Sequence, residues 1–139
     1  MIAKYLWIIG SIVITLLAGT HLYFTFFTNK FSTRNTKLVN DMQSSSPILT
    51  KKVTMWNAWI GFNASHSMGG IFIGIINLYL VLRYFPILQT DHFFFIFNIL
   101  TISFYVWLAT KYWYKTPLSG LTITLACYAT SCLLTIVVE

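Results

Sequence analysis

Apolar residues fall into four long runs along the chain, separated by two short connections and one long one. The runs cover residues 5–27, 56–82, 92–112 and 118–138. Because an α-helix rises 1.5 Å per residue, about 20 residues cross the roughly 30 Å of hydrocarbon in a bilayer. The pattern predicts an all-α protein, an integral membrane four-helix bundle that forms a single transmembrane domain over residues 1–139. Residues 28–55 are the long connection.

Composition supports this interpretation. Hydrophobic residues make up 57% of the 139 residues and charged residues only 9%, whereas about a quarter of a soluble domain is charged. An ordinary soluble domain and a disordered chain are therefore both excluded. Four spans also leave no room for a separate soluble catalytic domain. The first run follows Lys4 as a signal peptide would, but Leu16 and Leu17 stand where cleavage requires small residues, so we expect it to remain as a helix.

Basic residues predict the orientation of the spans. Seven of the nine Lys and Arg residues lie in the first and third connections: Lys30, Arg34, Lys37, Lys51, Lys52, Lys111 and Lys115. Connections rich in Lys and Arg face the cytoplasm, so both termini are predicted to lie outside it. The net charge of +6 then reflects topology and attraction to the lipid bilayer. Nucleic-acid binding is not expected, because no soluble basic surface is evident.

The long connection carries two local signals. Phe31, Leu38 and Met42 recur at helical spacing among basic and polar residues, which predicts a short amphipathic helix on the cytoplasmic leaflet, with a solvated linker as the alternative. Ser46 followed by Pro47 is typical of a helix start. The second long helix is therefore predicted to begin near Pro47, ahead of the apolar run itself.

The second run holds the densest set of polar and small residues. One stripe, spaced by three or four residues, consists of Asn63, His66, Gly70, Gly74 and Asn77. A second stripe of small residues consists of Gly61, Ser65 and Gly69. Small residues let neighbouring helix backbones approach closely. The predicted packing residues of this central helix are Gly61, Ser65, Gly69, Gly70 and Gly74.

Polar residues in the other runs also recur at helical spacing, which predicts a polar seam through the bundle. Asn98 and Tyr105 share a face of the third run, and Tyr128 lies on the polar face of the fourth. A polar side chain facing lipid is costly, so these faces are expected to point inward. The predicted ligand-binding residues are His21, Asn63, His66, Ser67, Asn98, Tyr105 and Tyr128.

His21 and His66 are the sharpest chemical feature. Measured from the charged borders of their runs, their depths differ by only about 4 Å, so antiparallel neighbours could bring them together with Asn63. Two imidazoles at this depth can ligate a haem iron, relay protons or hydrogen-bond a lipophilic molecule. A metal held by protein alone wants three or four ligands, and the runs contain no carboxylate, so no such metal site is predicted. Haem on His21 and His66 stays open as a cofactor.

Two stretches resemble a known group of proteins. The segment GFNASHSMG, with Gly61, Asn63 and His66, and the upstream GTHLYF, with Gly19 and His21, resemble small, uncharacterised four-span bacterial membrane proteins that share a GFN-x-SHS-x-G pattern. The resemblance implies the four-span topology and a bacterial inner membrane, and no chemistry. A weaker resemblance links the chain to emopamil-binding, sterol-isomerase bundles, which use acidic residues that this sequence lacks.

These observations favour a multi-pass membrane protein without catalysis of its own, since the polar centre has no acid and no nucleophile dyad and the chain has no room for a soluble domain; the catalytic residues are unknown. It would act as an accessory or interaction subunit, or bind a small lipophilic molecule through the polar seam. One alternative is an electron-transfer or oxidoreductase subunit with a bis-His cofactor. The other is an oligomeric transporter, because four helices are few for a transporter; a membrane protein partner or a homo-oligomer is then expected.

Overall fold

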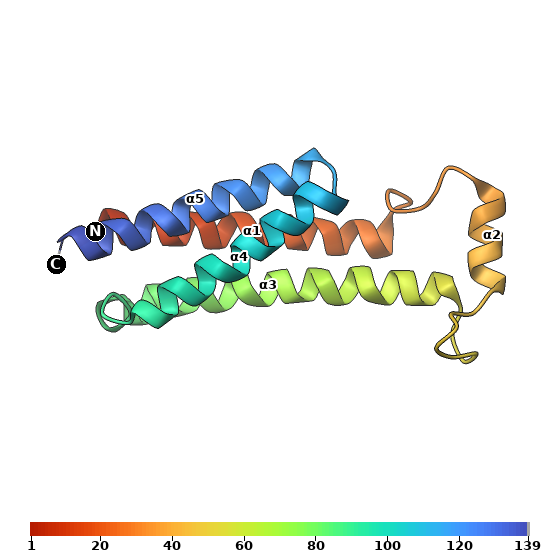
Figure 1. Ribbon diagram of the computed structural model, residues 1–139, viewed down its shortest axis with the longest axis horizontal. Coiled ribbons are helices and arrows are strands. Elements are labelled where there is room, and N and C mark those ends of the chain that lie inside the picture. The colour runs from red at the N-terminus through yellow and green to blue at the C-terminus, as the bar shows by residue number, and fades with distance from the viewer. Residues whose placement is uncertain (139) are drawn as a thin grey trace. The chain divides into compact units, whose positions relative to one another are not determined.

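A computed structural model describes residues 1–138, and within that range it contains five α-helices and no strand (Figure 1). The helices are α1 (Ile2–Phe27), α2 (Thr36–Ser44), α3 (Met55–Leu88), α4 (His92–Tyr112) and α5 (Lys115–Val138). All except α2 are long and apolar enough to cross a membrane. The all-α prediction is therefore confirmed, and the four apolar runs correspond to four such helices. The single-domain organisation stays a prediction.

The long connection differs from the prediction at one point. α3 begins at Met55, and residues 45–54 are not helical, so the prediction of a helix start near Pro47 is wrong. The Thr50 N–H bonds instead to the Pro47 carbonyl (3.2 Å), which closes a turn. The Thr54 hydroxyl accepts a hydrogen bond from the Asn57 N–H (3.2 Å) and satisfies an amide in the first turn of α3. Ser46 and Pro47 thus lead into a turn and do not start a helix.

α2 occupies the part of the connection where a short amphipathic helix is predicted. Its N-cap is Asn35, whose side chain accepts hydrogen bonds from the Lys37 and Leu38 N–H groups. Its position on the cytoplasmic leaflet stays a prediction.

The helices divide between two compact units. The bundle unit comprises Met1–Leu17 together with the chain from Gly70 onward, and the loop unit comprises Ala18–Gly69. α4 and α5 belong to the bundle unit and α2 to the loop unit, while α1 and α3 contribute a part to each.

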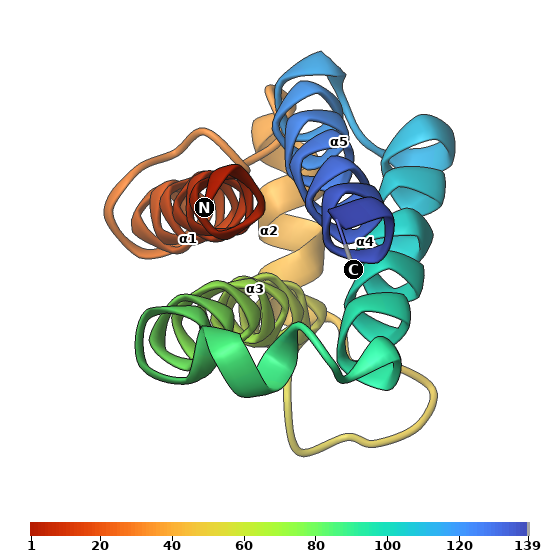
Figure 2. The same ribbon diagram turned by 90° about the vertical axis from the view of Figure 1, so that its left-hand side faces the viewer.

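Figure 2 shows the bundle unit end on, with α1, α3, α4 and α5 arranged around a common centre. Trp7 is fully buried in this unit. Its indole stacks on Tyr128 with ring centroids 3.9 Å apart and meets Phe95 edge to face at 4.8 Å. Its Nε1 donates to Asn77 Oδ1 (3.0 Å), and Asn77 Nδ2 donates to Asn98 Oδ1 (2.7 Å). One buried aromatic and two amides thereby connect all four helices.

α1 makes close contact with both α3 and α5 within the bundle unit. A Cβ added at Gly74 would lie 2.9 Å from the Ser11 carbonyl oxygen and would also collide with the Thr15 hydroxyl. Towards α5, the hydroxyls of Ser11 and Tyr128 share a hydrogen bond (2.9 Å), and Ser131 donates to the Ala3 carbonyl (2.7 Å). Small and hydroxyl-bearing residues therefore permit the helix approach that lipid-embedded bundles need.

The last turns of α3 are irregular for a specific reason. Tyr84 has non-helical dihedrals (φ −129°, ψ 19°) two residues before Pro86. Proline has no N–H to continue the helical ladder, and its ring crowds the carbonyl one turn earlier. The helix is therefore kinked close to its end, at the connection to α4.

Candidate functional site

His21 and Asn63 form a hydrogen bond between α1 and α3 in the loop unit. His21 Nε2 lies 3.1 Å from Asn63 Oδ1, and Asn63 Nδ2 donates to the Trp59 carbonyl (2.8 Å). Because the amide nitrogen is used on Trp59, the amide oxygen faces His21, and an oxygen can only accept. The imidazole therefore donates from Nε2, which in a neutral ring leaves the lone pair on Nδ1.

The structure brings His66 next to the same pair. It lies one turn beyond Asn63 on α3, and its ring contacts that of His21 edge to face, with centroids 5.6 Å apart. Both imidazoles are half-buried. His21, Asn63 and His66, together with Phe31 and Trp59, are called the histidine cluster.

Phe31 and Trp59 complete the cluster and are not among the residues that the sequence pattern singles out as a site. The Phe31 ring packs on His21 with centroids 4.3 Å apart, and Trp59 Nε1 donates to the Phe31 carbonyl (3.2 Å). Phe31 precedes α2 and is not part of it. Trp59 stands one turn before Asn63, which is a usable signal, but nothing in the sequence indicates that the chain turns back to place Phe31 on His21.

The hydroxyl groups nearest the cluster bond their own helices. Ser67 is buried and donates to the Asn63 carbonyl (2.8 Å). Thr25 is also buried and donates to the His21 carbonyl (2.9 Å). Such bonds to the preceding turn let a hydroxyl sit cheaply inside a membrane helix. A ligand role for Ser67 stays a prediction.

The other predicted ligand residues lie in the bundle unit. Asn98 accepts from Asn77 and donates to the Phe94 carbonyl (2.8 Å). Tyr128 is fully buried and bonds Ser11 through its hydroxyl. The Tyr105 ring lies 6.4 Å from that of Trp113. The amide and phenol thus belong to a hydrogen-bonded core, and ligand binding by these three residues stays a prediction.

The predicted packing residues have different surroundings. Gly74 is buried and tightly packed against α1. Gly70 is buried and Gly69 half-buried. Gly61 and Ser65 are exposed, and a Cβ at Gly61 would meet no heavy atom within 4 Å. The Gly61 face of α3 has room for a further helix, and its packing role stays a prediction.

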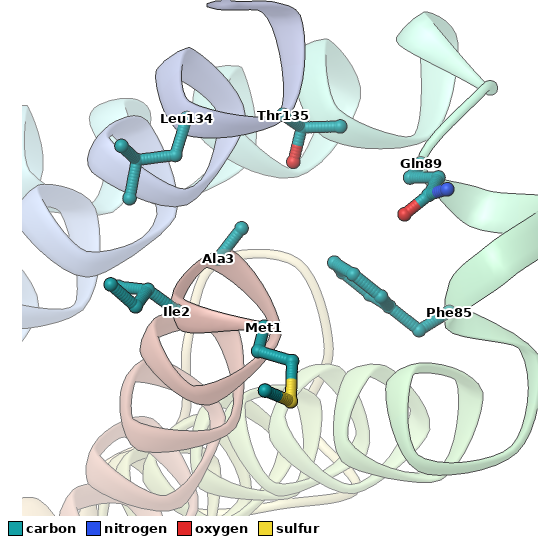
Figure 3. Close-up of a pocket in the computed structure, with 7 residues that line it drawn as sticks. All are labelled: Met1, Ile2, Ala3, Phe85, Gln89, Leu134 and Thr135. Carbon is teal, nitrogen blue, oxygen red and sulfur yellow. The ribbon is translucent and has the colours of Figure 1, made fainter. Parts of the chain in front are cut away.

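A pocket of about 450 Å³ lies at one end of the bundle unit, between the start of α1 and the ends of α3 and α5 (Figure 3). Its lining residues are Met1, Ile2, Ala3, Phe85, Gln89, Leu134 and Thr135. Phe85 points towards its centre, and the amide of Gln89 and the hydroxyl of Thr135 are its polar groups. Thr135 already donates to the Ser131 carbonyl (2.9 Å). The pocket is mainly apolar, and no residue predicted to form a site lines it.

Within residues 1–138, no group of three or more His, Cys, Asp or Glu side chains is placed to hold a metal ion. Cys127 and Cys132 are free thiols on α5.

Comparison of the chain with protein-family models, curated proteins and solved structures finds no match. The two resemblances drawn from short segments therefore stay predictions. What the structure itself supports is a set of four helices compatible with a multi-pass membrane protein.

Proposed function

We propose that this multi-pass membrane protein binds a small lipophilic molecule through a polar group held at the histidine cluster. The observation that carries the proposal is the His21–Asn63 hydrogen bond with the His66 ring beside it, inside helices whose central parts carry no charged residue. Helix packing in a membrane needs neither an imidazole nor an amide, because small residues suffice. Ionisable residues in membrane spans usually serve a function.

The hydrogen-bonding state of His21 favours one kind of polar group. Its Nε2–H is used on Asn63, so Nδ1 is available as an acceptor. An acceptor suits a ligand hydroxyl or N–H, while a ligand carbonyl would need a donor. The Phe31 ring, which packs on His21, and the Phe24 ring beside it offer apolar surface for the remainder of such a molecule. A lipophilic alcohol or amide N–H compound fits these features best.

The geometry favours this reading over the bis-His haem. The two imidazoles contact each other edge to face, and Nε2 of His21 is already hydrogen-bonded. A porphyrin held between them would require both rings to separate and turn their nitrogens to the iron. A ligand hydroxyl that binds Nδ1 of His21 would leave the His21–Asn63 hydrogen bond intact.

The proposal also covers the membrane, the orientation and the partner of the protein. The protein would lie in a bacterial inner membrane with both termini outside the cytoplasm, as its basic residues favour. It would act without catalysis of its own, as a binding protein or as an accessory subunit for a membrane partner or a second copy of itself. The exposed Gly61 face of α3 could accept such a helix.

The test is purification of the full chain from native membranes in mild detergent, followed by mass spectrometry of an organic extract and an absorbance spectrum. His21→Ala and His66→Ala are compared with His92→Ala, a matched control because His92 is exposed at the start of α4. We expect one enriched lipophilic species with the wild type and the control. Its amount should fall by roughly tenfold with His21→Ala, the effect of one lost hydrogen bond to the ligand.

Equal retention of that species by all three folded variants would contradict the proposal. A Soret band with stoichiometric iron in the wild type would favour the bis-His haem in its place. Loss of a co-purifying membrane protein, with no extracted species, would favour the accessory role alone.

A further inference from the structure

Residues 46–54 form a loop that is closed at its base. The Met55 N–H donates to the Ser45 carbonyl (2.8 Å), which joins the end of α2 to the start of α3. The turn from Pro47 to Thr50 places Ile48 and Leu49 at its two central positions. The loop therefore presents two large apolar side chains at its tip.

The exposure of these two side chains is unusual. Ile48 is 109% exposed and Leu49 95% exposed, as much as in an extended peptide. Val53, near the end of the loop, is also exposed. Apolar side chains gain free energy by leaving water, and adjacent exposed ones mark a contact surface. Something other than water is expected to cover this tip.

Charge identifies what covers it. Lys51 and Lys52 follow the tip directly, and the whole connection carries five basic residues against one acidic residue, Asp41. An apolar tip flanked by lysines matches a bilayer that contains anionic lipids: the aliphatic groups enter the hydrocarbon boundary and the ammonium groups meet phosphates. A water-soluble apolar partner would gain nothing from the lysines.

The orientation of α2 agrees with this placement. Within the loop unit, α2 runs across the direction of the first turns of α3 (Figure 1). If α3 crosses the bilayer, α2 lies along its surface, at the level of the loop. Leu38 and Met42, four residues apart, share one face of α2, while Asn40 lies on the opposite face and is exposed.

We propose that the connection between α1 and α3 binds the surface of an anionic bilayer, with Ile48 and Leu49 inserted below the headgroups and Lys51 and Lys52 at lipid phosphates. This membrane-binding loop is independent of the ligand proposed for the histidine cluster. It makes the protein sensitive to the anionic lipid content of its own leaflet.

The test uses the full chain, with Cys127 and Cys132 replaced by serine, and a nitroxide spin label at Leu49→Cys. The control is Asn40→Cys, on the face of α2 opposite Leu38. Each is reconstituted in phosphatidylcholine vesicles with or without phosphatidylglycerol. We expect the label at position 49 to collide with oxygen more than with a water-soluble nickel chelate when phosphatidylglycerol is present, and the label at position 40 to show the reverse.

Charge variants test the lysines separately. Lys51→Gln with Lys52→Gln should lower the oxygen-to-nickel collision ratio at position 49 by roughly tenfold in the anionic vesicles. Lys111→Gln with Lys115→Gln removes the same charge elsewhere and should leave the ratio unchanged. Equal nickel access at positions 49 and 40 in both vesicles would overturn the proposal and point to a protein as the occupant. Equal insertion with and without phosphatidylglycerol would overturn the role of the lysines.

Discussion

The Asn63 amide determines which nitrogen of His21 carries the proton and how the ring is oriented. Its Nδ2 donates to the Trp59 carbonyl and its Oδ1 accepts from His21 Nε2. Turning the amide over, so that nitrogen and oxygen change places, would break the hydrogen bond to Trp59. In an apolar setting a polar group without a partner is costly. The amide therefore fixes both the direction of the imidazole and the nitrogen that carries its proton.

Asn63→Ala tests this at the residue scale. The substitution leaves the His21 N–H without its acceptor, and we expect the free energy of unfolding in mixed micelles to fall by about 1–2 kcal/mol. Retention of the extracted ligand should fall with it. Asn57→Ala is the matched control, since Asn57 is an exposed residue of the same type on the same helix, and its effect should stay within about 0.5 kcal/mol. Equal effects of the two substitutions would mean that the bond has no energetic role.

The buried amides of the bundle unit permit a second residue-scale prediction. Asn77 joins the Trp7 indole to Asn98 and also donates to the Ile73 carbonyl of its own helix, so Asn77→Ala removes three hydrogen bonds, two of them between helices. We expect a loss of about 1–3 kcal/mol in the free energy of unfolding. In a double-mutant cycle, Asn77→Ala and Asn98→Ala should cost less together than the sum of their separate costs, because they share one bond. Strict additivity would show that the Asn77–Asn98 bond contributes nothing.

The candidate site was predictable only in part from the sequence. Depth and helical phase, both readable from a 3.6-residue period, single out His21, Asn63 and His66, and these three do meet. The period reports which face of a helix a residue occupies and not which residue lies opposite. Phe31 could not be placed, because its contact with His21 depends on a chain reversal after Phe27 that no periodicity encodes.

At the scale of elements, long apolar runs predicted α1, α3, α4 and α5 because a membrane crossing sets a minimum length. The start of α3 was not predictable from its local signal. Ser46 and Pro47 have the chemistry of a helix start, but the Met55–Ser45 backbone bond and the Thr54 cap move the start eight residues along the chain. Residues with the chemistry of a helix start can also form other hydrogen bonds. Which of these bonds form depends on the fold.

Two glycines of α3 test packing at the element scale. Gly74→Ala places a methyl group against the Ser11 carbonyl and the Thr15 hydroxyl, so we expect the free energy of unfolding to fall by about 1–3 kcal/mol. Gly61→Ala meets open space and should gain up to about 1 kcal/mol from the higher helix propensity of alanine. Thermal unfolding in detergent measures both. A loss at Gly61 of the same size, seen only at high protein concentration, would indicate that another copy packs on that face.

At the scale of the whole molecule, the basic residues are expected to determine the orientation in a membrane. Lys30, Arg34, Lys37, Lys51 and Lys52 all lie between α1 and α3, whereas the connection between α3 and α4 contains no Lys or Arg beyond Arg83 in the last turns of α3. Moving five charges across a bilayer is far costlier than moving one. The asymmetry predicts that the first connection stays in the cytoplasm.

Cysteine labelling in intact cells that express the protein tests this orientation. In a chain with Cys127→Ser and Cys132→Ser, single cysteines replace Ser45 in the first connection and Thr90 in the second, both exposed. We expect a membrane-impermeant maleimide to label Thr90→Cys and spare Ser45→Cys, because the basic connection is predicted to face the cytoplasm. A permeant maleimide should label both, which controls for reactivity. Labelling of Ser45→Cys alone by the impermeant reagent would reverse the orientation, and would place the loop with Ile48 and Leu49 on the outer leaflet.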